Sequence, residues 1–152
     1  MMPVHKRRRT ITSCAVLLLL GEETKNMFSH IMVGSNDIAR SKKFYDATLG
    51  ALGIGPAITD PNGRLFYMTP AGVFAVSKPI DGKGASHANG ATIGFAAASG
   101  EQAAAWHAAG VANGGTAIED PPGVREGGMG KLYLAYLRDP DGNKLCALHR
   151  MG

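Results

Sequence analysis

The sequence predicts an α+β fold built from two copies of one strand–helix–three-strand unit. Along residues 27–152 the hydrophobic periodicity changes twice from strand-like to helix-like and back to short strands. An internal repeat at an offset of 62 residues relates the two halves, and it matches a strand, a helix cap, an aromatic residue and a stop glycine together. The 21 glycines suit such a turn-rich chain better than a helical bundle.

The first unit begins with the nearly continuous apolar stretch 28–34, which predicts a strand. Asp37 supplies N-cap chemistry for a helix that extends to about Leu49, where glycines end it. Turn-forming Pro, Asn and Gly residues then separate three short strands, which are expected at residues 55–59, 64–69 and 73–78. Residues 79–90, which are rich in Gly, Ala and Ser, form a connector to the second unit.

The second unit repeats this order. Residues 91–98 predict a strand, and Ser99 with Gln102 forms a capping box for a helix to about Val111. Further strands are expected at residues 116–119, 131–138 and 143–150. The segment 121–130 is polar and glycine-rich, so we expect a loop there.

Specific residues align in the repeat. His30 pairs with Thr92 in the two first strands, and Phe44 pairs with Trp106 on the two helices. We therefore expect Phe44 and Trp106 to be equivalent buried anchors. The later strands leave this register because the segment 121–130 is longer than its counterpart.

Charge and cysteine content narrow the class of partner. Five of the 16 basic residues but only two of the 12 acidic residues precede residue 27, so residues 27–152 carry 11 basic against 10 acidic side chains. A nearly neutral body without a basic stripe argues against nucleic acid as a partner. Cys14 and Cys146 offer no disulfide framework, and the reducing cytoplasm is the expected compartment.

Residues 1–26 stand apart from the repeat. A basic cluster followed by an apolar run over residues 11–20 looks like the start of a signal peptide, but no small-residue cleavage pattern follows. The apolar run is also too short to span a bilayer, so no membrane is expected as a partner. We interpret residues 1–26 as a dispensable, signal-like extension or an upstream start-site artefact, and residues 27–152 as the domain.

Three motifs carry a resemblance to a known family. His-Ile-x-Val occupies residues 30–33, Ser-Lys-Lys-Phe-Tyr residues 41–45 and Arg-Asp-Pro-Asp-Gly-Asn residues 138–143. In this order, within a duplicated unit, they resemble the glyoxalase/bleomycin-resistance/extradiol-dioxygenase superfamily, also called vicinal oxygen chelate proteins. The resemblance covers residues 27–150. It implies two βαβββ modules that form an open, incomplete barrel with the helices outside and a ligand on the concave face.

The same resemblance implies four metal-ligand positions, usually His or Glu, for a divalent Zn, Ni, Fe or Mn ion. His30 keeps the family residue, whereas Thr92, Ala75 and Cys146 replace ligands. Catalytic sites normally use three protein ligands, so a His–Cys pair is too few for tight binding. We therefore expect no cofactor, with a metal on His30 and Cys146 as the alternative. Without a metal, His30 would be a catalytic base or a hydrogen-bonded imidazole, and Cys146 a thiolate nucleophile or a small buried residue.

Small and polar residues of the expected strands are candidates for the lining of the cup. These candidates are His30, Ala75, Ser77, Thr92, Gly94 and Cys146. Arg125, in the expected loop, would either present a guanidinium to an anion or be a solvated surface charge. Strand alternation places Tyr133 and Tyr136 on opposite faces, so only one of them can line the cup.

Three function classes remain open from the sequence. The first is metal-free binding of a small molecule in the cup, as in the bleomycin-resistance branch that the chain resembles. The second is a metal-dependent lyase, isomerase or dioxygenase of the glyoxalase type, and the third is an interaction protein with a vestigial cup. Several members of the family that the chain resembles form homodimers, and the sequence does not determine whether this chain does.

Overall fold

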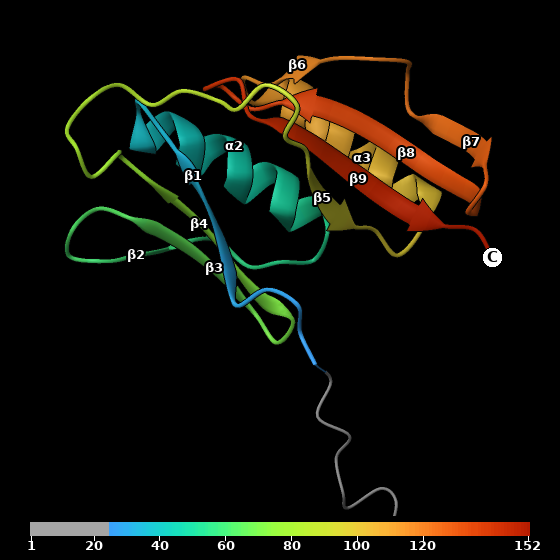
Figure 1. Cartoon of the computed structure of the whole chain (residues 1–152), viewed down its shortest axis with the longest axis horizontal. Helices are drawn as coiled ribbons and strands as arrows, with labels where there is room; N and C mark the ends of the chain where they lie inside the picture. Colours follow the sequence, from blue (N-terminus) through green and yellow to red (C-terminus); the bar gives the residue numbers. More distant parts are fainter. Residues whose placement is uncertain (1–24) are drawn as a thin grey trace, which may run out of the picture.

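The computed structural model describes residues 25–152, and the interpretation of residues 1–26 as an extension therefore falls almost entirely outside the described part. The first module consists of β1 (His30–Gly34), α2 (Ile38–Ala51), β2 (Ile58–Thr59), β3 (Leu65–Thr69) and β4 (Gly72–Ser77). The second module consists of β5 (Ile93–Ala96), α3 (Gly100–Ala112), β6 (Thr116–Ala117), β7 (Gly123–Gly127), β8 (Gly130–Arg138) and β9 (Lys144–Arg150). The predicted α+β duplication is confirmed (Figure 1).

The two modules share one sheet topology. The strand order is β1-β4-β3-β2 in the first sheet and β5-β9-β8-β6 in the second, with β7 added beside β8. In each module the first and last strands are parallel, and the other neighbours are antiparallel. Met32 pairs with Ala75, and Gly94 pairs with Cys146. Ala75 and Cys146 therefore occupy equivalent positions in the two last strands.

The expected loop at residues 121–130 was wrong. Residues 123–127 form β7, which pairs with β8 in a hairpin. Backbone pairing stabilises this edge strand although its side chains lack apolar alternation. The glycines of the segment serve the turn instead, and Gly130 has a left-handed φ of 90°.

Both helices begin at the predicted caps. The side chain of Asp37 accepts a hydrogen bond from Arg40 N at 3.0 Å, and Ser99 Oγ accepts one from Gln102 N at 3.0 Å. The Gln102 side chain reaches back and accepts from Ala98 N at 2.6 Å. This bond completes the predicted capping box one residue before the cap itself.

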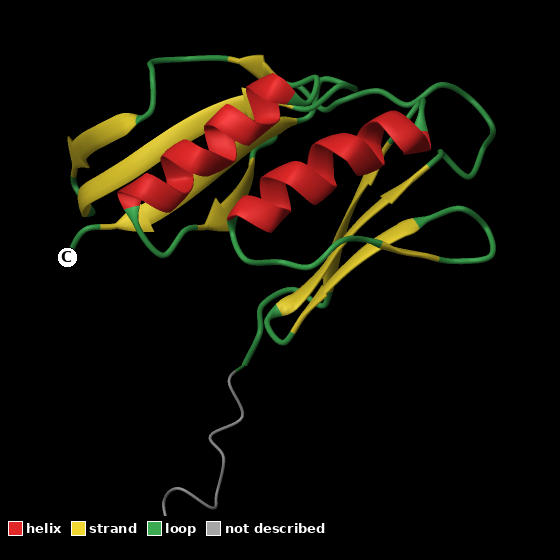
Figure 2. Cartoon of the chain, turned by 180° about the vertical axis from the view of Figure 1, so that it is seen from behind, coloured by secondary structure: helices red, strands yellow, loops and turns green. Residues whose placement is uncertain are grey.

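The helices pack beside each other and cover one face of each sheet (Figure 2). Gly110 lies at their crossing, where an added Cβ would stand 3.2 Å from Thr48 Cγ2 and 3.3 Å from Phe44 Cε2. Phe44 and Trp106 are both fully buried, as the repeat predicted. The helix-covered faces of both sheets share one hydrophobic core, so each sheet keeps a second face that the helices do not cover.

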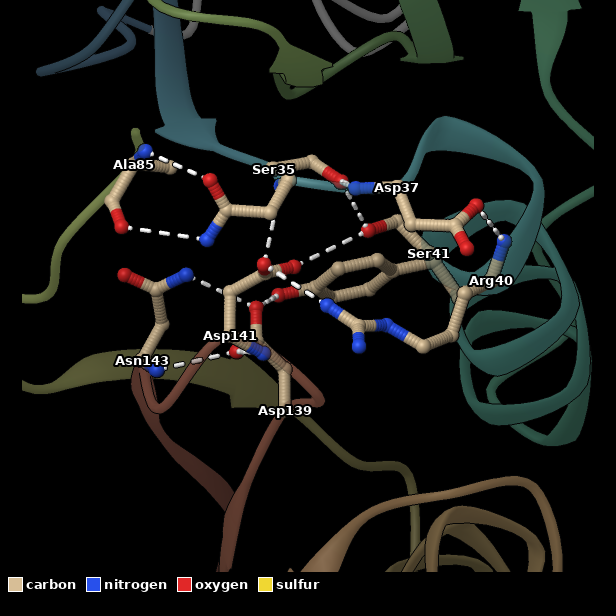
Figure 3. Close-up of polar contacts among 10 residues, drawn as sticks. Ser35, Asp37, Arg40, Ser41, Ala85, Asp139, Asp141 and Asn143 are labelled. Atoms are coloured by element: carbon tan, nitrogen blue, oxygen red, sulfur yellow. Dashed lines mark hydrogen bonds and ion pairs between the residues drawn. The ribbon is translucent and has the colours of Figure 1, made fainter. Parts of the chain in front are cut away.

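The turn between β8 and β9 contacts the first module directly (Figure 3). Asp139 is buried and accepts a hydrogen bond from Tyr45 Oη at 2.5 Å. Asp141 forms an ion pair with Arg40 at 2.9 Å and accepts a hydrogen bond from Ser41 Oγ at 3.2 Å. The Asp-Pro-Asp-Gly-Asn segment therefore forms the hairpin turn and also binds α2 through hydrogen bonds and an ion pair.

Among residues 25–152, no helix combines the length and the apolar composition needed to cross a membrane.

Candidate functional site

The pairing registers define an open face on each sheet, opposite the helices. Side chains alternate along a strand, so residues two apart share a face. The open face of the first sheet carries His30, Met32, Phe66, Met68, Val73, Ala75 and Ser77. The open face of the second sheet carries Gly94, Ala96, Leu134, Tyr136, Lys144, Cys146 and Leu148. All the cup candidates that lie within strands stand on these two faces.

A cleft of about 310 Å³ lies where the two modules meet. Most of its lining is apolar and comes from β1, β5, the β3–β4 hairpin, the C-terminal end of α2 and the residues that follow it. These apolar residues include Ile31, Leu49, Leu52, Ile54, Tyr67, Phe74, Ile93 and Phe95. His30 and Gly94 are the two cup candidates that line this inter-module cleft. An added Cβ at Gly94 would meet nothing within 4 Å, so this glycine leaves open space in the cleft.

His30 is exposed, and its Nδ1 lies 2.9 Å from Ser29 Oγ. The imidazole is thus a polar group at the wall of a mostly apolar cleft. Thr92 is also exposed and directly precedes β5, but it does not line the cleft.

The other candidates lie elsewhere. Ala75 is fully buried beneath its neighbours, and Cys146 is 4% exposed. Ser77 lines a separate, larger groove of about 1280 Å³ between the connector and the β2–β3 hairpin, and its Oγ donates to Lys78 O at 2.9 Å. The structure therefore divides the six predicted cup residues among several environments.

The residues at the four positions where the family resemblance implies metal ligands supply few donor atoms. Ala75 has no donor atom, and Thr92 offers only a neutral hydroxyl. Burial raises the pKa of the Cys146 thiol, which opposes formation of the thiolate that binds metals. Across the described residues no group of three His, Cys, Asp or Glu side chains is placed to hold a metal ion. This donor set does not fit the divalent ion that the family implies.

Polar side chains on the second sheet form a cluster that the sequence did not reveal. Tyr136 pairs with Cys146 across β8 and β9, and the Lys144 ammonium lies 5.1 Å from the centre of the Tyr136 ring. Lys144 also forms an ion pair with Glu119, from the segment between β6 and β7. The alternation that separates Tyr133 from Tyr136 was visible in the sequence, whereas the contact with Glu119 depends on the path of a non-repetitive segment.

Three of the histidines within residues 25–152 lie outside the candidate cup. His87 in the connector stands over Gly142, where an added Cβ would come within 2.6 Å of its Nδ1. His149 Nδ1 lies 3.1 Å from Ala97 O and supports the pairing of β9 with the end of β5. His107 is half-buried on α3, and burial lowers its pKa although a hydrogen bond with the Tyr136 backbone opposes the shift. Each of these three side chains therefore contacts another segment of the fold.

Solved structures with the same fold include a close sequence relative. A glyoxalase/bleomycin resistance protein from Albidiferax ferrireducens T118 is 65% identical with a TM-score of 0.80, and the match covers 82% of this chain and 99% of that one. A glyoxalase-related enzyme from Fulvimarina pelagi is 20% identical with a TM-score of 0.63, over 83% of this chain and 89% of that one. A lactoylglutathione lyase from Agrobacterium tumefaciens is 15% identical with a TM-score of 0.57, over 84% and 96%. No curated protein matches the chain.

The family model described as Glyoxalase/Bleomycin resistance protein/Dioxygenase superfamily matches residues 27–147. This match spans both modules and includes the whole of all three motifs, at residues 30–33, 41–45 and 138–143. The sheet order, the duplicated helices and the 65% identical relative agree with it. The chain belongs to the Glyoxalase/Bleomycin resistance protein/Dioxygenase superfamily.

Proposed function

We propose that the chain binds a small, largely apolar molecule in the inter-module cleft without the help of a metal ion. The cleft itself is the observation that carries the proposal. Its volume of about 310 Å³ and its apolar lining are those of a site for a small organic ligand. His30 supplies a polar group at its wall, and Gly94 supplies the space.

The composition of the four family metal positions supports binding over metal-dependent catalysis. Imidazole at His30 is joined by an alanine, a threonine and a buried thiol, which is too few strong donors for a catalytic ion. The likeness to the lyase from Agrobacterium tumefaciens, at 15% identity, supports a shared fold alone. A metal-dependent lyase, isomerase or dioxygenase therefore ranks second.

Ligand binding can be tested with a neutral aromatic probe, naphthalene-2-carboxamide, titrated into the full chain in the presence of EDTA. The substitution Gly94→Val places a branched side chain in the cleft, and Gly94 has ordinary strand geometry that accepts it. Gly127→Val is the matched control, because Gly127 is also a strand glycine with open space around it. We expect binding to the unmodified chain and to Gly127→Val, and at least about tenfold weaker binding to Gly94→Val. Equal affinities in the three proteins would exclude the cleft as the site.

Metal dependence has its own test. Zn, Ni, Fe and Mn are measured in protein purified without chelator, and probe affinity is compared before and after EDTA treatment. We expect substoichiometric metal and unchanged probe affinity. Stoichiometric metal that is lost in His30→Ala would favour the enzyme instead.

We also propose a homodimer, because the structure leaves surfaces that a second copy would cover. The strands β1 and β5 are both sheet edges, and Met32 and Met68 are 46% and 60% exposed on the open face of the first sheet. Light scattering on the purified chain should give twice the monomer mass, and Met68→Lys should shift it toward the monomer. A monomer mass for the unmodified chain would exclude the dimer.

A further inference from the structure

A row of side chains crosses the open face of the second sheet, starting from the inter-module cleft. Gly94 on β5 pairs with Cys146 on β9, which pairs with Tyr136 on β8. Adjacent strands are about 4.8 Å apart, so Tyr136 stands about 10 Å from Gly94 on the same face. A ligand that lies along this face can therefore contact β5 at one end and the Tyr136 hydroxyl at the other.

Arg125 lies beside this row with its guanidinium free of any carboxylate. On β7 it pairs with Leu132, which places it on the same open face. Its side chain runs back over Gly123, where an added Cβ would be 3.3 Å from Nη1. Nη2 donates to Pro121 O at 2.8 Å, and no acidic side chain of residues 25–152 forms an ion pair with it. The guanidinium is thus held in place by backbone carbonyls and keeps N–H groups for a ligand.

The charge of this region favours an anion. The ammonium of Lys144 is paired with Glu119, and Glu119 adopts a left-handed φ of 58° where it makes that contact. A non-glycine residue in this conformation carries a backbone cost that its surroundings must offset. Lys144 offsets the charge of Glu119, and Arg125 supplies the remaining positive charge among these three side chains.

Tyr136 is suited to donate a hydrogen bond. Burial raises the pKa of its phenol, and the neighbouring Cys146 thiol and the Glu119 carboxylate raise it further, whereas the charge of Arg125 acts in the opposite direction. The phenol therefore keeps its proton at neutral pH. A protonated phenol and a guanidinium on one face can both donate to the oxygens of one carboxylate.

We propose that Arg125 and Tyr136 recognise the carboxylate of a small monocarboxylic acid whose apolar part lies against β5. The proposal rests on the proposed ligand binding and names the chemical class of the ligand. A carboxylate matches the paired N–H groups of one guanidinium, and the small residues Gly94 and Ala96 leave room for an apolar group at the other end of the row.

The test compares two probes of the same shape on the full chain, naphthalene-2-carboxylate and the neutral naphthalene-2-carboxamide, by isothermal titration calorimetry at neutral pH. We expect the carboxylate to bind about tenfold more tightly than the amide. Arg125→Gln should remove this preference, because it weakens binding of the carboxylate more than binding of the amide. Arg125→Lys, which keeps the charge without the paired N–H groups, should keep part of it.

Matched controls remove equivalent groups from the opposite face. Lys131→Gln deletes one positive charge from the same β7–β8 hairpin, and Tyr133→Phe deletes a phenol from the helix-covered face of β8. Both should leave the preference for the carboxylate intact, whereas Tyr136→Phe should reduce it severalfold.

The outcomes separate the two proposals. Equal affinity for the acid and the amide, or a preference that survives Arg125→Gln, would overturn the carboxylate site while ligand binding in the cleft stands. A preference lost equally in Lys131→Gln would also overturn it, because general attraction by charge would then explain the result. If neither probe binds the unmodified chain, both the carboxylate site and the proposed function are overturned for aromatic ligands.

Discussion

Tyr45 on α2 donates a hydrogen bond of 2.5 Å to Asp139 in the β8–β9 turn, 94 positions later in the chain. Asp139 also accepts from the backbone N–H groups of Asp141 and Asn143, both at 2.9 Å, and from the Asn143 amide at 2.8 Å. These bonds satisfy the oxygens of a buried carboxylate. The turn of the second module and the helix of the first are thereby joined through one side chain.

Tyr45→Phe should lower the free energy of unfolding by about 1–3 kcal/mol, because a buried carboxylate oxygen loses a donor. Tyr133→Phe is the control, since the Tyr133 hydroxyl makes no hydrogen bond to the described residues. Urea unfolding of the two variants provides the measurement. Equal losses in both would show that the bond to Asp139 contributes nothing specific.

The stability that Asp46 contributes should depend on pH. Burial opposes ionisation of this carboxyl, but the Lys42 ammonium, Ala57 N–H and Tyr67 hydroxyl together lower its pKa below the ordinary value. A lowered pKa in the folded state adds stability that is present above the pKa of the unfolded chain and is lost as the pH falls through the folded value. Asp46→Asn should therefore cost about 1–2 kcal/mol near neutral pH and progressively less as the pH falls below about 4. A cost that does not change with pH would contradict this linkage.

Truncation of either aromatic anchor, Phe44 or Trp106, should lower the free energy of unfolding by a similar amount, whereas an aromatic replacement of Trp106 should lower it less. Phe44→Ala and Trp106→Ala should each cost about 3–5 kcal/mol, because both side chains are fully buried. Trp106 Nε1 is buried without a hydrogen-bond partner among the described residues. Trp106→Phe removes this unpaired N–H, and we expect it to cost less than half as much as Trp106→Ala in urea unfolding. A cost equal to that of the alanine variant would show that the indole ring as a whole is required.

The Cys146 thiol should be unreactive in the folded protein. Burial raises its pKa, and the side chain is only 4% exposed. In a Cys14→Ser background, which leaves one thiol, reaction with Ellman's reagent should be slow at neutral pH and fast in denaturant. Rapid reaction of the folded chain would instead identify Cys146 as an accessible nucleophile facing the open side of the second sheet.

Local chemistry determined much of this fold. The caps at Asp37 and Ser99, the duplicated order of elements and the burial of Phe44 and Trp106 all follow from neighbouring residues and periodicity. The opposite orientations of Tyr133 and Tyr136 follow from alternation in a single strand. Such features depend on interactions within a few residues, and these are visible in one sequence.

Only the tertiary structure decided which of these elements meet. It divided the predicted cup residues, bringing His30 and Gly94 into one cleft while Cys146 stands in a row with Tyr136. It paired the polar segment 123–127 with β8, and it placed Asp139 against Tyr45. The physical reason is common to all three: each depends on contacts between residues far apart in the chain, whose geometry is set by packing the two modules on one core.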